Sequence, residues 1–144
     1  MLKTLSLLAL LVMVVALLGL LANRSLLARS PAAIALQVAA VALVTWARLT
    51  FGLRSFHARA DPTPGGLVTT GPYRFIRHPI YTGLCLLAWA GVISNWSETS
   101  ASMGVLLVAA SVGRMLCEER LVVELYPEYR QYARRTWRMV PFVF

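Results

Sequence analysis

The sequence predicts an all-α integral membrane protein with about four transmembrane helices, a cytoplasmic loop and a C-terminal interfacial helix. Hydrophobic residues make up 58% of the 144 residues, charged residues only 14%, and the mean hydropathy is +0.67. This apolar content exceeds what a water-soluble domain of the same length needs to fill its core. The apolar residues also fall into four runs between polar segments, and no stretch alternates as a half-buried strand does.

The first two runs extend over residues 5–21 and 32–51. The first is longer than the apolar part of a secretory signal and lacks a small-x-small cleavage site, so it predicts a retained transmembrane helix. The second follows Ser30 and Pro31, and Trp46 near its end is typical of an anchor at the membrane interface.

The third run extends over residues 79–93 and the fourth over residues 101–117, from which its helix is expected to continue toward residue 125. The polar residues 94–100 predict a tight hairpin between them. A long loop rich in proline and glycine, over about residues 52–76, precedes the third run, and loops of this length are more often functional than idle.

The C-terminal region begins at the helix-breaking Pro127. We expect a surface helix over residues 127–132 with this proline at its first position. The basic and aromatic tail that follows is typical of a segment lying on the membrane surface. A single domain of residues 1–144 is predicted, with a helix pair over residues 1–51 and a cofactor-binding and catalytic region over residues 52–144.

The basic residues favour contact with a lipid bilayer over contact with nucleic acid. The net charge is +8 and all but one of the 14 basic residues are arginines, which lie at the ends of apolar runs. The loop before the third run and the C-terminal region carry most of them, which predicts that both termini face the cytoplasm of a bacterial inner membrane. Arg24 and Arg29 then lie on the outer side, against this rule. Cys85 and Cys117 have no CxxC spacing, so they predict packed thiols, and no metal site is indicated.

Two polar clusters lie at the ends of apolar runs. His78 directly precedes Pro79, which opens the third helix, and Arg114 is followed by Glu118 and Glu119 at the end of the fourth. Ionisable side chains are costly at a membrane boundary unless they bind something. We therefore expect one site built from both clusters.

The ordered set of motifs resembles the isoprenylcysteine carboxyl methyltransferase and phospholipid methyltransferase group of membrane enzymes. These enzymes use S-adenosylmethionine, and the resemblance covers roughly residues 55 to 144. It is carried by residues 67–73, residues 77–83, Arg114 with Glu118 and Glu119, and then Tyr129, Tyr132, Arg138 and Pro141. Each motif alone is weak, and the ordered set is specific.

The resemblance implies a role for each matching residue. The residues that line the cofactor are then Leu67, Val68, Tyr73, His78, Pro79, Ile80, Tyr81 and Glu118. Arg114 matches the position that meets the substrate. The chain departs from some relatives at Ala58 and Arg59, where they place an amide side chain on the cofactor loop.

Methyl transfer from a sulfonium depends mainly on aligning the reactants and excluding water. Arg114 is expected to orient a prenylcysteine-like carboxylate, whereas an aminophospholipid or a thiol must lose a proton, for which His78 and Glu119 are the candidates. The catalytic candidates are therefore Arg114, His78 and Glu119, acting on a lipophilic substrate that enters from the membrane.

Other interpretations stay open. Some nicotinamide-dependent sterol reductases share a similar C-terminal half, and a non-enzymatic membrane scaffold also accounts for the apolarity. Arg114 and Glu118 are four residues apart on one helix face, which equally fits a structural salt bridge. Glu119 points about 100° away from Glu118, which fits a structural contact with an arginine as well as a role in the site.

Overall fold

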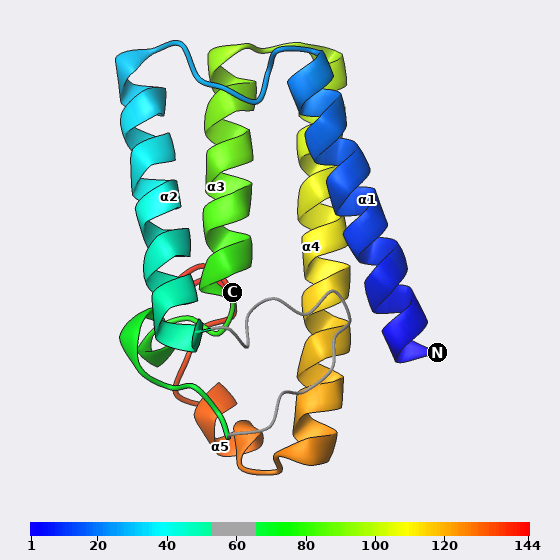
Figure 1. The fold of residues 1–144 in the computed structure, drawn as a ribbon, viewed down its shortest axis with the longest axis vertical. Helices are drawn as coiled ribbons and strands as arrows, with labels where there is room; N and C mark the ends of the chain where they lie inside the picture. Colours follow the sequence, from blue (N-terminus) through cyan, green and yellow to red (C-terminus); the bar gives the residue numbers. More distant parts are fainter. Residues whose placement is uncertain (53–65) are drawn as a thin grey trace.

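The computed structural model describes residues 1–52 and 66–144, and these residues form an all-α membrane protein (Figure 1). In chain order the helices are α1 (Leu2–Ala22), α2 (Pro31–Phe51), the short 3-10 helix η2 (Gly71–Arg74), α3 (Pro79–Ser94), α4 (Glu98–Leu125) and α5 (Tyr129–Ala133). Helices α1, α2 and α4 are long and apolar enough to cross a membrane. Helix α3 is apolar but has 16 residues, or about 24 Å, which is somewhat shorter than a bilayer core.

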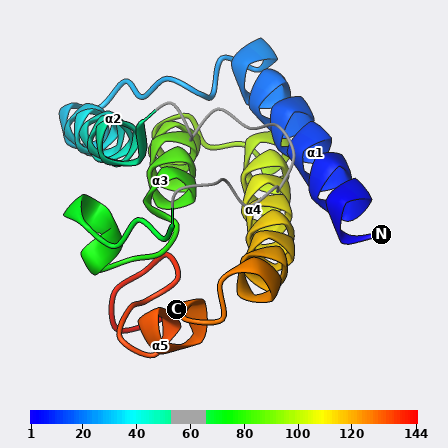
Figure 2. The same cartoon turned by 60° about the horizontal axis from the view of Figure 1, so that its bottom comes forward.

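The four long helices alternate in direction, so both termini lie at the same end of the molecule (Figure 1). Helix α1 packs along α4, and α2 packs along α3. Each N-terminal helix therefore has a C-terminal partner, and the division of the domain at residue 51 stays a prediction. Seen from the end that holds the termini, α5 and the C-terminal tail lie beneath α3 and beside the end of α4 (Figure 2).

Small residues allow these helices to approach closely. The buried face of α2 presents Ala33, Ala40 and Ala47, one every seven residues. Opposite them on α3, a Cβ atom added at Gly83 would lie 2.5 Å from the side chain of Val44 and 2.9 Å from the carbonyl oxygen of Ala40. Contacts between small residues are the usual basis of helix pairing in membranes, because lipid supplies no hydrophobic force between helices.

A hydrophobic core joins α1, α3 and α4. Its buried members are Met13, Ala16, Leu20, Ala88, Val92, Leu107 and Ala110. The outer faces of α1 and α2 are also apolar, with exposed side chains such as Leu11, Leu18, Val38 and Leu49. An apolar surface on both the inside and the outside of a helix bundle is what a lipid environment requires.

The hairpin between α3 and α4 is confirmed, but it is tighter than the sequence predicts. Helix α4 begins at Glu98 because Ser97 caps it, with Ser97 and Ser100 satisfying each other's backbone N–H groups. The predicted start of the surface helix at Pro127 is wrong. A turn closed by the backbone bond from Tyr129 to Tyr126 contains this proline, and α5 begins only at Tyr129.

Candidate active site

Helix α4 presents Glu119 to the segment that leads into α3. Its Oε1 atom accepts hydrogen bonds from Arg77 Nε at 2.8 Å and Tyr129 Oη at 3.2 Å, and it lies 3.2 Å from His78 Nε2. Its Oε2 atom accepts a hydrogen bond from Arg138 Nε at 3.1 Å. Glu119 therefore joins α4, the entrance of α3, α5 and the C-terminal tail.

The C-terminal tail is also held by backbone hydrogen bonds. Residues Ile76 and Trp137 form a parallel bridge, with Arg77 N–H donating to the Trp137 carbonyl at 2.7 Å and His78 N–H to the Arg138 carbonyl at 2.9 Å. The Arg77 guanidinium donates to the carbonyls of Ala133 and Thr136. These contacts place the backbone of His78 directly against the tail, an arrangement that no strand-like pattern in the sequence indicates.

One residue earlier on α4, Glu118 faces a different set of groups. Its Oε1 atom accepts hydrogen bonds from Tyr81 Oη at 2.7 Å and pairs with Arg114 Nε at 3.0 Å. Arg114 also donates to Tyr81 Oη at 2.7 Å and to the backbone carbonyl of Ser6 on α1 at 3.0 Å. The Arg114 side chain is only 5% exposed and that of Glu118 is 23% exposed, so the pair is buried on one side and open on the other.

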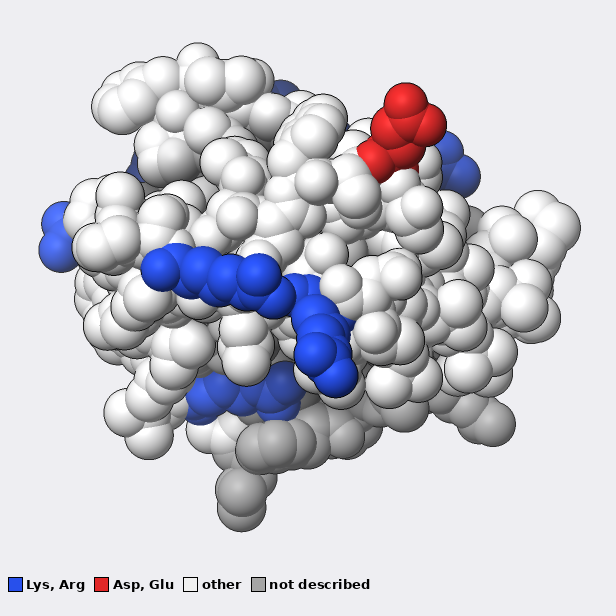
Figure 3. All heavy atoms as spheres, turned by 90° about the horizontal axis from the view of Figure 1, so that it is seen from above, with Lys and Arg blue, Asp and Glu red and all other residues white. Residues whose placement is uncertain are grey.

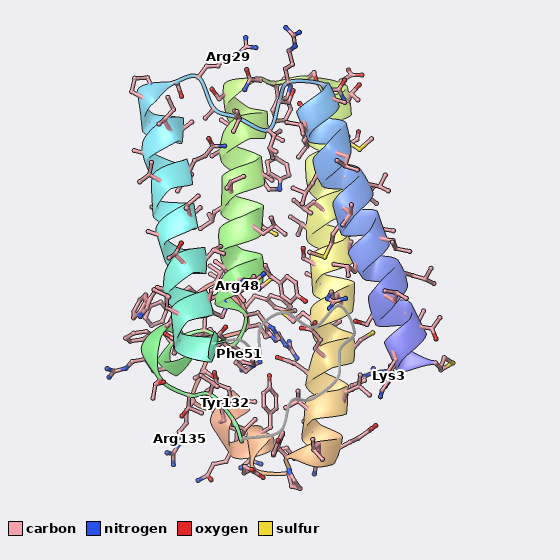
Figure 4. All side chains as sticks on the ribbon, viewed as in Figure 1. Lys3, Arg29, Arg48, Phe51, Tyr132 and Arg135 are labelled. Carbon is pink, nitrogen blue, oxygen red and sulfur yellow. The ribbon has the colours of Figure 1, made fainter. Side chains whose placement is uncertain are left out.

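Tyr73 borders the same end of the bundle. Its ring lies 5.5 Å from the ring of Phe51 at the end of α2, and its carbonyl accepts a hydrogen bond from Tyr132 Oη at 2.6 Å. Figure 4 shows Tyr132 and Phe51 at the end of the molecule opposite Arg29. Burial raises the pKa of Tyr73, with further contributions from Tyr132 and Glu118, and burial raises the pKa of Tyr132 to about 12. Both phenols therefore stay protonated at neutral pH, and the Tyr132 hydroxyl donates to the Tyr73 carbonyl.

The structure brings five of the predicted site residues together at the start of α3 and in the C-terminal half of α4. They are His78, Tyr81, Arg114, Glu118 and Glu119. The rings of His78 and Tyr81 lie 5.8 Å apart. Pro79 is buried as the first residue of α3, and Ile80 beside it is half-buried.

Leu67 and Val68 are half-buried in the segment before η2, and their contact with a cofactor stays a prediction. Ala58 and Arg59 lie outside the described residues. Sequence reasoning assigned no role to Arg77 or to Ser6, although both contact predicted site residues. The position of Arg77 next to His78 in the motif could have indicated a role for it. No sequence motif indicates Ser6, because its contact is made through its backbone carbonyl.

The two adjacent carboxylates have different surroundings. Glu119 is contacted through both oxygens by residues that hold the tail. Glu118 is contacted through Oε1 alone, and within the described part of the chain its Oε2 has no hydrogen-bonding partner. Glu118 therefore has a fixed orientation and an oxygen that a ligand can reach, beside the paired rings of His78 and Tyr81. No cluster of three metal-ligating side chains occurs among residues 1–52 and 66–144.

A family model of phospholipid methyltransferases matches residues 28–129, more than two thirds of the chain. The chain belongs to this family. The match takes in α2, α3, α4 and the Arg114–Glu119 cluster, and it begins well before the motifs that carry the resemblance. The four apolar helices of the fold agree with a membrane protein.

Three curated relatives are similar to parts of this family member. The cobalt-zinc-cadmium resistance protein CzcN of Cupriavidus metallidurans is 33% identical over 78% of this chain and 50% of its own. Methanethiol S-methyltransferase 1 of Bradyrhizobium diazoefficiens is 36% identical over 57% of this chain and 28% of its own. The nickel-cobalt-cadmium resistance protein NccN of Alcaligenes xylosoxydans xylosoxydans is 31% identical over 52% and 36%. The chain spans half the length or less of these relatives, and no solved structure matches it significantly.

Proposed function

We propose that this chain is a membrane methyltransferase that binds S-adenosylmethionine between the start of α3 and the C-terminal half of α4. The observation that carries the proposal is Glu118, a carboxylate fixed by Tyr81 and Arg114 through one oxygen and open at the other. Family membership supports the same activity. The cofactor, when bound, supplies an electrophilic methyl group on a sulfonium.

The groups around Glu118 fit the chemistry of this cofactor. A carboxylate oxygen with a fixed direction accepts hydrogen bonds from the ammonium or hydroxyl groups of such a molecule. The adjacent rings of His78 and Tyr81 offer aromatic surface to a cation, which contributes on the order of 1 kcal/mol. Leu67, Val68, Tyr73, Pro79 and Ile80 are proposed to complete the cofactor-binding surface.

The contacts of Arg114 limit which class of methyl acceptor can bind. Its charge is compensated by Glu118, and its remaining contacts include the Tyr81 hydroxyl and the Ser6 carbonyl. Binding an anionic acceptor here requires breaking a largely buried ion pair, which is costly at membrane depth. We therefore propose an acceptor whose reacting group arrives without a negative charge, a thiol or an amine, in preference to a carboxylate. The similarity to a methanethiol S-methyltransferase supports a thiol.

A thiol or an amine must lose a proton, and His78 is the group proposed to accept it. Both oxygens of Glu119 already accept hydrogen bonds, from Arg77 and Tyr129 on one side and Arg138 on the other, which leaves it poorly placed to accept the proton. In the tautomer that donates its Nε2–H to Glu119, the His78 ring presents Nδ1 as the atom that accepts the proton. Arg114 and Glu119 then act as positioning residues, one for Glu118 and the other for His78.

The binding test is calorimetry of S-adenosylhomocysteine with the detergent-solubilised chain. Glu118→Gln should weaken binding by about 1.5–3 kcal/mol, roughly ten- to a hundredfold, because a charge-assisted hydrogen bond is lost. The control is Glu124→Gln, the same change at an exposed position of α4, which should bind as the parent does. Equal affinity in the two variants would remove Glu118 from the site.

The acceptor test uses methyl-labelled S-adenosylmethionine with three acceptors of comparable chain length: an alkanethiol, phosphatidylethanolamine and a prenylcysteine. We expect transfer to the thiol or the amine to exceed transfer to the carboxylate. Preferred transfer to the prenylcysteine carboxylate contradicts the assignment of the acceptor and leaves the methyltransferase proposal intact. A parent chain that binds no S-adenosylhomocysteine contradicts the methyltransferase proposal itself.

A further inference from the structure

The connection between α1 and α2, residues 23–30, lies at the end of the molecule opposite the candidate active site. A pocket on it is lined by Leu21, Arg24, Leu26, Leu27, Ala28 and Arg29. Figure 3 looks onto this end and shows basic side chains across the middle of a largely uncharged face. The pocket thus combines two guanidinium groups with leucine side chains at a membrane boundary.

The backbone of this connection is held firmly in place. Asn95 Nδ2 donates to the Leu27 carbonyl at 2.8 Å, and the N–H groups of Arg29 and Ser30 donate to Ser94 Oγ at 2.7 and 3.1 Å. Gln37 donates to the Leu26 carbonyl at 2.7 Å and accepts from the Ala28 N–H at 3.1 Å. The second half of the connection is therefore held by polar side chains of α2 and of the end of α3.

Gly91 on α3 makes this close docking possible. A Cβ atom at residue 91 would lie 2.2 Å from the Leu26 carbonyl oxygen and 2.5 Å from that of Ser25. Arg24 adopts a positive φ of 54°, which is uncommon for a residue with a side chain. The fold thus presents the two arginines from a rigid, tightly packed loop, which reduces the entropy lost when they bind a ligand.

The two guanidinium groups have no counter-charge in the described chain. Both side chains are exposed, and among residues 1–52 and 66–144 no carboxylate lies within ion-pair distance of either. Glu98, the acidic residue that opens α4 at this end, pairs with neither. An arginine at a membrane boundary is stabilised by an anion, and a planar guanidinium matches the oxygens of a phosphate.

We propose that this pocket binds the phosphate group of an anionic phospholipid from the leaflet opposite the candidate active site. Arg24 and Arg29 contact the phosphate, and the acyl chains lie along Leu21 and Leu27, whose side chains are 53% and 67% exposed. The combination of two cations and apolar lining favours a lipid over a free phosphate, because a free phosphate gains nothing from the leucines. Such a site gives a function to the two exposed arginines, Arg24 and Arg29, on the connection between α1 and α2.

Native mass spectrometry of the detergent-solubilised full chain tests the proposal with phosphatidylglycerol and phosphatidylcholine of the same acyl composition. We expect one phosphatidylglycerol to bind at least about tenfold more tightly than phosphatidylcholine, a difference of about 1.4 kcal/mol. The double variant Arg24→Gln/Arg29→Gln should lose this preference. The matched control, Arg134→Gln/Arg135→Gln, changes two exposed arginines at the opposite end and should keep it.

Three outcomes overturn the proposal. They are equal affinity of the parent for the two lipids, an unchanged preference in the Arg24/Arg29 variant, and full displacement of the lipid by inorganic phosphate at a comparable concentration. Thermal unfolding of each variant in detergent shows that it is folded. If the glutamine variant does not fold, Arg24→Lys/Arg29→Lys keeps the charge and should retain part of the preference.

Discussion

Replacing Glu119 by glutamine tests whether this carboxylate holds the C-terminal tail against the entrance of α3. The change keeps the shape of the side chain and removes its charge. A glutamine oxygen can still accept from Arg77, but its NH₂ group then faces the Arg138 guanidinium, which is also a donor. The alternative orientation leaves Arg77 facing the NH₂ group instead.

The expected loss follows from the exposure of the partners. The Glu119 and Arg77 side chains are 12% and 8% exposed, so this is a largely buried pair, for which removing one partner costs about 3–5 kcal/mol. Arg77 keeps its hydrogen bonds to the carbonyls of Ala133 and Thr136, which lowers the cost. The Arg138 side chain is 36% exposed, and its ion pair contributes about 0–1 kcal/mol. We expect the free energy of unfolding to fall by roughly 2–3 kcal/mol.

Two measurements check this expectation in detergent. Thermal unfolding should show a lower midpoint for Glu119→Gln than for the parent, and Glu124→Gln, an exposed change on the same helix, should unfold as the parent does. Limited trypsin digestion should cut faster at Arg134 and Arg135 in Glu119→Gln, because the tail is released more often. An unchanged midpoint together with an unchanged cleavage rate would refute the structural role of Glu119.

Three further predictions concern other parts of the structure. Arg114→Ala should weaken binding of S-adenosylhomocysteine by roughly tenfold in calorimetry, because Glu118 loses the partner that orients it, and Arg114→Lys should weaken it less. Parent-like affinity in both variants would contradict this. Gly91→Ala should lower the free energy of unfolding by an overpacking cost of about 1–3 kcal/mol and so lower the thermal midpoint, whereas Gly113→Ala, with open space around the added Cβ, should leave the midpoint unchanged. Between pH 10 and 12 the unfolded chain releases the Tyr132 proton while the folded chain keeps it, so the free energy of unfolding should fall as pH rises. This fall should be shallower in Tyr132→Phe. Equal slopes of unfolding free energy against pH in the parent and the variant would contradict this.

Much of the fold and part of the site are determined by the sequence alone. The apolar runs predict α1 to α4 to within a few residues, because in lipid an uninterrupted apolar run of this kind is stable as a helix, which satisfies its own backbone. The motif around His78 and the cluster ending in Glu119 also predict that two distant segments form one site, and the family match agrees with the resemblance that they carry. The predicted start of the fourth helix at residue 101 is wrong, because the Ser97 cap opens α4 at Glu98 despite the polarity of the residues that follow it.

Only the tertiary structure decides how these pieces are used. It separates Glu118, which faces Arg114 and Tyr81, from Glu119, which faces the tail. It also brings the carbonyl of Ser6 on α1 to Arg114, across more than a hundred residues of sequence. Lipid attracts all apolar helix faces nearly equally, so the choice of partner depends on the fit of small residues and on a few polar contacts between distant segments. Those contacts have no local signature in the sequence, and they appear only when the helices are assembled.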